Sequence, residues 1–184
     1  MKALTIVLSL ITLTVLSCGS TQTTSTPAEI EALKKLVDSK SFYIESEWAY
    51  PQVSAAMSQV LNSPLMRGTG NGGGSINLIG NPNFLKLEGD SITSYLPYYG
   101  ERRMGAAYGG TDNGIEFKGL VKDYEVKANK HSGYTIRFDA TSNNENFDVS
   151  IDLYPNMKSS MTLNGNTRTT IMYTGNVKAK KDED

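Results

Sequence analysis

The chain has very few of the residues on which most enzyme and metal sites depend. Its 184 residues include a single cysteine, a single histidine and a single tryptophan. One cysteine cannot form a disulfide within the chain, and one cysteine with one histidine cannot supply the usual ligand sets of zinc. A Ser-His-Asp triad would have to use His131, which lies in a turn-forming stretch, and the chain has no G-x-S-x-G nucleophile motif. We therefore predict no catalytic residue, no metal and no cofactor, and a protein that is not an enzyme.

The chain also lacks an excess of charge of one sign. Lys and Arg together number 18, and Asp and Glu together number 19. A protein that binds nucleic acid neutralises phosphates with surplus basic residues, so we expect no nucleic acid partner. Opposed charge blocks at residues 179–184 predict a solvated charged tail.

Long hydrophobic runs are absent except at the start of the chain. Lys2 is followed by an uncharged, largely aliphatic run over residues 3–16. This run is too short for a helix that crosses a bilayer, which needs about 20 apolar residues. It fits the hydrophobic region of a secretory signal peptide, so we assign residues 1–17 to a signal peptide and leave them out of the fold.

Cys18 follows this run directly, in the segment Val15-Leu16-Ser17-Cys18-Gly19. The segment resembles the lipobox of bacterial lipoproteins, which implies that Cys18 is diacylated and becomes the first residue of the mature protein. Each buried methylene contributes about 0.8 kcal/mol, so two or three acyl chains hold a soluble domain firmly at a membrane.

The residues after Cys18 predict a tether and a location. Residues 18–26 are small, polar and uncharged, which favours a flexible link between lipid and domain. Gly19 and Ser20 show no inner-membrane retention signal, and no acidic cluster of the kind associated with surface export follows Cys18. We therefore expect an anchor in the outer membrane that faces the periplasm.

A glycine-rich loop at residues 67–75 (RGTGNGGGS) contains the spacing G-x-G-x-x-G at Gly68, Gly70 and Gly73. In a dinucleotide-binding loop this spacing lies between a strand and a helix, and the helix N-terminus receives the pyrophosphate. Here the turn signal Ser63-Pro64 precedes the loop, and residues 75–79 alternate like a strand. We therefore predict a flexible loop and no nucleotide.

One domain is predicted over residues 27–178. Thr26, Pro27 and Glu29 form a helix start with a capping box, and the apolar spacing continues a helix over residues 27–39. Apolar residues then alternate with period two, as in β-strands. The alternating segments are 42–50, 76–78, 85–87, 120–126, 134–138, 147–153, 161–163 and 171–173.

Turn-forming residues separate these segments at intervals of about 8 to 12 residues, which is typical of antiparallel β proteins. The predicted fold class is mainly β: an antiparallel meander of about eight or nine strands forming a barrel or sandwich, with one short N-terminal helix. Two segments fit neither pattern. Residues 53–65 predict a short helix or an irregular excursion, and residues 97–111 predict a long loop.

The remaining chemistry is carried by carboxylates and by one aromatic, basic loop. Each of two predicted strands places a pair of acids on one face, and such pairs are more often solubilising than catalytic. Residues 142–146 offer many oxygen atoms without EF-hand spacing, which favours a hairpin turn. Two arginines beside tyrosines in the loop at 97–111 are a candidate anion or sugar patch. These residues are Glu45, Glu47, Asp148, Asp152, Arg102, Arg103, Tyr98, Tyr99 and Tyr108.

Several short segments, taken in order, carry a family likeness. They are residues 49–51 (AYP), 75–78 (SINL), 89–91 (GDS), 96–100 (LPYYG), 114–117 (GIEF) and 166–175 (NTRTTIMYTG). Together they resemble family 4251 among the domains of unknown function. That resemblance implies an exported, mostly lipid-anchored, β-rich protein of Bacteroidetes, and it implies no activity.

Residues 52–74 look like an insertion relative to the family pattern. The resemblance carries over no binding residue. Arg168 and the segment Leu96-Pro97-Tyr98 suit structural roles, because an Arg can pair across strands and Pro with Tyr can close a sheet edge.

Three functions follow from these observations. The first is a structural or interaction component of the cell envelope, with an envelope protein as partner. The second is binding of a small apolar ligand or a glycan, by a barrel interior or a sheet surface. The third is a carboxylate-based hydrolase. An interior cavity of about 300 Å³ or more would favour the ligand-binding barrel, whereas a filled core would favour the interaction component.

Overall fold

The computed structural model describes residues 25–64, 71–72, 74–103, 114–142 and 145–180. Within these residues, two helices, α2 (Pro27–Asp38) and α3 (Ala55–Leu61), accompany one antiparallel sheet of eleven strands. The strands are β1 (Ser41–Pro51), β2 (Ile76–Asn77), β3 (Phe84–Glu88), β4 (Ser91–Pro97), β5 (Gly114–Ile115), β6 (Lys118–Leu120), β7 (Lys122–Ala128), β8 (Tyr134–Ser142), β9 (Glu145–Leu153), β10 (Lys158–Gly165) and β11 (Ile171–Ala179).

Helix α2 begins with the predicted capping box. The Thr26 Oγ1 atom accepts a hydrogen bond from the Glu29 amide at 3.3 Å, and Glu29 Oε2 accepts one from the Thr26 amide at 2.8 Å. These bonds satisfy two of the amide groups that a helix start leaves free. Leu33, Leu36 and Val37 form the buried stripe of the helix, as their spacing predicts.

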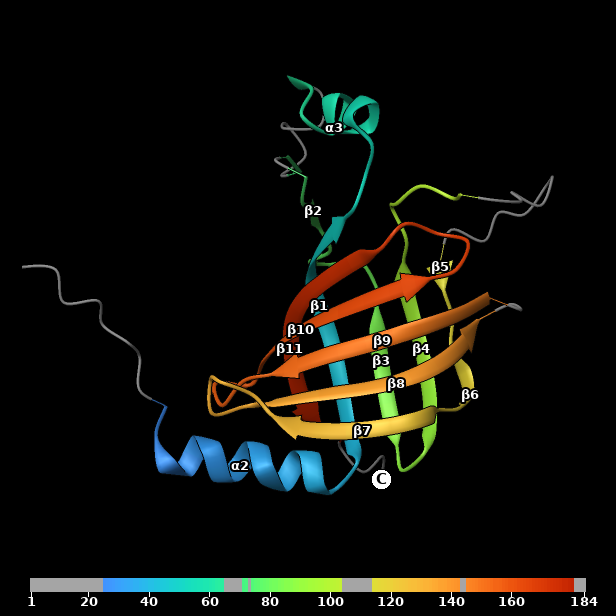
Figure 1. The fold of residues 1–184 in the computed structure, drawn as a ribbon. Helices are drawn as coiled ribbons and strands as arrows, with labels where there is room; N and C mark the ends of the chain where they lie inside the picture. The colour runs from blue at the N-terminus through green and yellow to red at the C-terminus, as the bar shows by residue number, and fades with distance from the viewer. Residues whose placement is uncertain (1–24, 65–70, 73, 104–113, 143–144, 181–184) are drawn as a thin grey trace, which may run out of the picture.

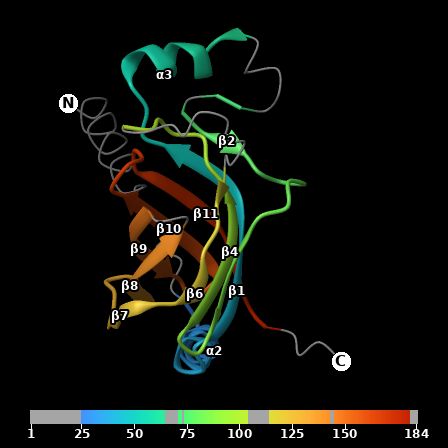
Figure 2. The same ribbon diagram turned by 90° about the vertical axis from the view of Figure 1, so that its right-hand side faces the viewer.

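The strand order is close to that of an up-and-down barrel. Successive strands from β7 to β11 pair with one another, β11 pairs with β1, and β1 continues through β3 to β4. The sheet therefore bends into two layers, with β7 to β10 crossing in front of β1, β3 and β4 (Figure 1). Helix α2 lies at one end of these layers, and α3 lies beyond the other end (Figure 2).

The ring of strands stays open between β4 and β7. Strand β6 pairs with β4, whereas β7 pairs with β8, so the chain changes from one edge of the sheet to the other at Val121. The Val121 amide donates to the Asp90 carbonyl at 2.9 Å, and Lys40 contacts both the Asp90 carboxylate at 3.1 Å and the Tyr124 ring at 4.6 Å. These contacts hold the two edges near each other at the end where α2 lies.

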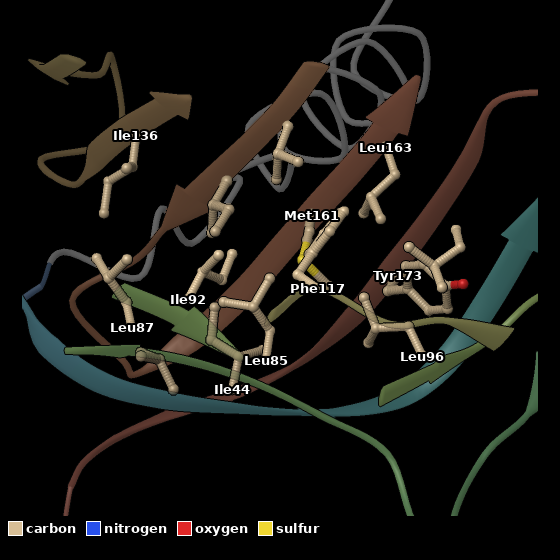
Figure 3. Close-up of a cluster of buried hydrophobic side chains, with 14 of the residues drawn as sticks. Ile44, Leu85, Leu87, Ile92, Leu96, Phe117, Ile136, Met161, Leu163 and Tyr173 are labelled. Atoms are coloured by element: carbon tan, nitrogen blue, oxygen red, sulfur yellow. The ribbon is translucent and has the colours of Figure 1, made fainter. Parts of the chain in front are cut away.

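The core occupies the space between the two layers. Apolar side chains from β1, β3 and β4 point toward those from β8 to β11 (Figure 3). The largest side chains with less than 2 % exposure include Tyr173, Phe42, Phe117, Phe138, Phe147 and Leu85. Full burial of one such side chain stabilises the fold by about 1.5 to 3 kcal/mol, so this contiguous cluster dominates its stability.

The prediction of a mainly β, antiparallel fold is confirmed, with differences in detail. The sheet has eleven strands instead of eight or nine, because β4 and β5 were not predicted and residues 120–126 form parts of two strands. The uncertain segment at 53–65 contains a second helix, α3. Residues 98–103 of the predicted long loop are described and 104–113 lie outside the described residues.

Candidate functional site

A buried ion pair joins Arg168, in the segment 166–175 of the family likeness, to Glu145 at the start of β9. The Arg168 side chain is 3 % exposed and that of Glu145 is 9 % exposed, and Arg168 Nε donates to Glu145 Oε2 at 2.8 Å. Arg168 Nη1 donates to the Gly114 carbonyl at 3.2 Å, and Glu145 Oε1 accepts from the Thr167 amide at 3.3 Å. A buried charge is costly unless it is paired, so these bonds make each group depend on the other.

Tyr98 extends this cluster into the segment at 96–100. Its ring lies 5.0 Å from the Arg168 guanidinium, a cation–π distance, and its hydroxyl lies 2.8 Å from the Thr169 carbonyl. The neighbouring Tyr173 hydroxyl donates to the Pro97 carbonyl at 2.8 Å. Burial raises the pKa of both tyrosines, so both hydroxyls stay protonated near neutral pH.

The cluster of Arg168, Glu145, Tyr98 and Thr169 fastens the sheet at the end away from α2. It ties β5, the start of β9, the residue that follows β4 and the connection between β10 and β11 into one network. Both Glu145 carboxylate oxygens accept hydrogen bonds, and Arg168 balances the charge. A general base needs a free lone pair within reach of a substrate, so this arrangement suits a structural role better than a catalytic one.

Arg102 and Arg103 lie on a short segment that pairs with residues 167–169 of this cluster. Arg102 forms a β-bridge with Arg168, and the Arg103 amide donates to the Thr167 carbonyl at 2.7 Å. Tyr99 is 36 % exposed beside this segment, and burial with a contribution from Tyr95 raises its pKa. Tyr108 lies outside the described residues.

The four candidate carboxylates lie on the outside of the sheet. Glu45 pairs with Lys178 at 3.2 Å, and Glu47 pairs with Lys158 at 3.3 Å. Asp152 accepts a hydrogen bond from Thr135 at 2.5 Å, and Asp148 lies opposite Asp139 in the β8–β9 ladder, where both are exposed. Carboxylates on the outer face, paired with lysines or exposed to solvent, lack the apolar, enclosed surroundings that a catalytic general acid needs.

A polar pocket of about 250 Å³ opens beside Glu45 and Glu47. Asn176 Nδ2 donates to Glu47 Oε1 at 2.6 Å, and this bond, with the smaller effect of Lys158, holds the pKa of Glu47 below its usual value. The lining residues are Glu45, Ser46, Glu47, Leu78, Ile79, Gly80, Asn176 and Lys178. Glu45 and Glu47 are thus brought together, while Asp148 and Asp152 remain on another part of the sheet.

An apolar groove of about 460 Å³ lies beside α2. It is lined by Ala32, Lys35, Leu36, Ser39, Met157 and Ala179. Its volume falls within the range of small-molecule sites, about 300 to 1,000 Å³. The groove lies between α2 and the sheet residues Met157 and Ala179. A ligand enclosed by a barrel would instead lie between the two layers, where the core side chains pack.

The other predicted features have plain structural outcomes. Gly68, Gly70 and Gly73 lie outside the described residues, and the chain that follows forms the short strand β2, so no helix begins there. His131 is exposed in the β7–β8 turn. Within the described ranges, no three His, Cys, Asp or Glu side chains gather as metal ligands would.

Two features bear on the membrane. Cys18, the predicted lipidation site, lies outside the described residues, so it stays a prediction from the sequence. Among the described residues, neither helix has the length and hydropathy needed to span a bilayer.

The comparison with known proteins identifies a family. The model of a family described as a domain of unknown function, DUF4251, matches residues 25–177. The chain belongs to the DUF4251 family. The matched residues include all four members of the cluster of Arg168, Glu145, Tyr98 and Thr169. They also include the residues of the polar pocket up to Asn176.

A solved structure shows the same fold. The crystal structure of a DUF4251 family protein from Bacteroides eggerthii DSM 20697 aligns with a TM-score of 0.55 at 13 % sequence identity, over 83 % of this chain and 88 % of that one. No curated protein matches this DUF4251 chain. At this identity the likeness concerns the fold alone.

Proposed function

We propose that this DUF4251 protein is a lipid-anchored component of the cell envelope that binds other envelope molecules through its outer surface, without catalysis. The proposed anchor is diacylated Cys18, in the outer membrane and facing the periplasm. The domain would then project from the membrane on the tether of residues 18–26.

The filled space between the two sheet layers is the observation that carries this proposal. Leu85, Leu87, Phe117, Met161 and Tyr173 meet there and are each at most 1 % exposed. A barrel that encloses a ligand needs a cavity at this place, whereas both pockets described above open on the outside. The geometry therefore favours surface binding over an enclosed ligand.

The positions of the carboxylates support a role without catalysis. A glycosidase holds two carboxyl groups about 5 to 9.5 Å apart across a cleft and raises the pKa of one of them. Here the buried Glu145 is neutralised by Arg168, and Glu47 has a lowered pKa. Neither group has the properties of the required general acid.

Co-purification from its native cells tests the proposal. The full-length protein is extracted in a mild detergent, and the proteins and glycans that accompany it are identified by mass spectrometry. A stoichiometric protein or a retained glycan is expected, and a Cys18→Ala variant that stays off the membrane should lose partners that reside there. A protein that purifies alone, or that hydrolyses a panel of fluorogenic glycosides and loses this activity as Glu47→Gln, would contradict the proposal.

A further inference from the structure

We propose that the polar pocket on the outer face of β1 and β11 binds a neutral sugar residue of an envelope glycan. This inference rests on the proposed surface-binding function and names its ligand class. The pocket consists of Glu45, Glu47, Asn176 and Lys178 with the loop at 78–80. Its volume of about 250 Å³ is below the range for drug-sized ligands, which suits one sugar ring of a longer chain.

A bulge in β1 lies at the pocket. The β1–β11 register shifts between Ser46 and Trp48, so Glu47 is an extra residue in that ladder. On the other side of β1, the Glu47 carbonyl accepts a hydrogen bond from the Leu78 amide at 2.8 Å. This bond continues the pairing of β1 with β2 and attaches the loop at 78–80, which forms one wall of the pocket.

A buried asparagine keeps the wall in place. Asn83 is 4 % exposed, and its side chain accepts from the Ser46 amide at 2.8 Å and donates to the Ser46 carbonyl at 2.9 Å. It also donates to the Asn81 carbonyl at 3.0 Å. A site held by such bonds loses little entropy when a ligand binds, so this wall is pre-organised.

The polar groups of the pocket favour an uncharged ligand that both donates and accepts hydrogen bonds. Glu45 pairs with Lys178, and Glu47 pairs with Lys158 and Asn176, so two carboxylates face two ammonium groups. The balanced charge gives neither a cation nor an anion an advantage. Sugar hydroxyl groups can donate to the carboxylates and accept from the amide and ammonium groups.

Aromatic rings continue the site along the sheet. Tyr43 and Phe84 stack with their ring centres 5.7 Å apart and an angle of 12° between their planes. Tyr43 lies directly opposite Lys178 in the β1–β11 ladder, which places this ring next to the pocket. Tyr95 lies directly opposite Phe84 and is 43 % exposed, and Ile79 is 68 % exposed at the pocket wall. Apolar surface beside convergent polar groups is the usual composition of a small-molecule site.

Calorimetric titration with defined oligosaccharides tests the inference. The full-length protein, in a detergent without a sugar headgroup, is titrated with cellohexaose, mannohexaose and chitohexaose. At least one should bind, and Glu47→Gln and Asn176→Ala should each weaken its binding about tenfold or more, because each removes a hydrogen-bond partner of the sugar. Circular dichroism of each variant should match that of the unchanged protein.

Glu88→Gln is the matched control. Glu88 lies on the same outer face between Lys86 and Lys180, at 2.8 and 2.5 Å, but outside the pocket. Its substitution should leave sugar binding unchanged. The inference is overturned if no neutral oligosaccharide binds, if folded pocket variants bind as well as the control, or if only an acidic oligosaccharide binds and high salt abolishes it.

The outcomes separate this inference from the proposed function. A protein partner that co-purifies with unchanged yield from the pocket variants, without any bound sugar, leaves the surface-binding function standing and removes the sugar site. The absence of both a partner and a sugar removes both.

Discussion

Loss of the buried arginine should be the most destabilising single change at the end of the sheet away from α2. Arg168→Met keeps an apolar stem next to Tyr98 but leaves the Glu145 carboxylate, 9 % exposed, without its cation. Removing one partner of a buried ion pair costs about 3 to 5 kcal/mol. For a domain of this size that cost lowers the melting temperature by about 6 to 20 °C.

The assay is urea unfolding followed by circular dichroism and by the fluorescence of Trp48, the single tryptophan. The double variant Arg168→Met, Glu145→Gln should be more stable than the sum of the two single losses predicts, by at least about 1 kcal/mol, since no unpaired charge remains. A single-variant loss below about 1 kcal/mol, or strictly additive effects, would refute the argument that the pair is coupled and buried.

Three further predictions concern packing and pH. Gly175→Ala should destabilise the fold by about 1 to 3 kcal/mol, because the new Cβ would lie 2.0 Å from the Glu45 carbonyl oxygen. Gly114→Ala, whose new Cβ would have its nearest contact at 3.6 Å, should cost far less in the same urea assay. Burial raises the pKa of Tyr124 to about 12, so its contribution to stability is complete below pH 10 and is lost as the pH rises from 10 to about 12. In an absorbance titration of tyrosinate, the ionisation step near pH 12 should disappear in Tyr124→Phe. Hydrogen bonds from Lys180 and Lys86 lower the pKa of Glu88 to about 2, so its contribution to stability is present above pH 4.5 and is lost as the pH falls to about 2. The acid unfolding of Glu88→Gln should therefore depend less on pH in that window. An acid unfolding curve identical to that of the unchanged protein would count against the pairing.

Local patterns predicted the secondary structure well where one principle governs a segment. The capping box of α2 and the alternation in β9 are examples, because helix caps and a half-buried strand leave direct marks in the sequence. Strand β4 was missed although Ile92, Ser94 and Leu96 alternate and are buried. The inward-facing Ser94 is polar and so interrupts the apolar pattern. Its hydroxyl oxygen accepts a hydrogen bond from the Phe117 amide at 2.9 Å.

The sites depend on contacts between residues that are far apart in the chain, and a single sequence carries little sign of these. Arg168 was recognised as a cross-strand pairing residue, but its partner Glu145 lies in a polar stretch that is typical of an exposed turn. Likewise nothing in the sequence marks Glu47 as a bulge residue, or Asn83 as the residue whose side chain bonds the neighbouring Ser46 backbone. Register and burial decide these roles, and they become visible only when the strands are paired.

Intact-mass spectrometry of the protein purified from its own membranes tests the lipid anchor most directly. A lipid anchor at Cys18 predicts a mature chain that begins at Cys18 and carries two or three acyl chains. It also predicts a Cys18→Ala variant that is neither acylated nor retained by membranes after a salt wash. A mature chain with an unmodified Cys18 thiol, or a variant that remains in the membrane fraction, would contradict it.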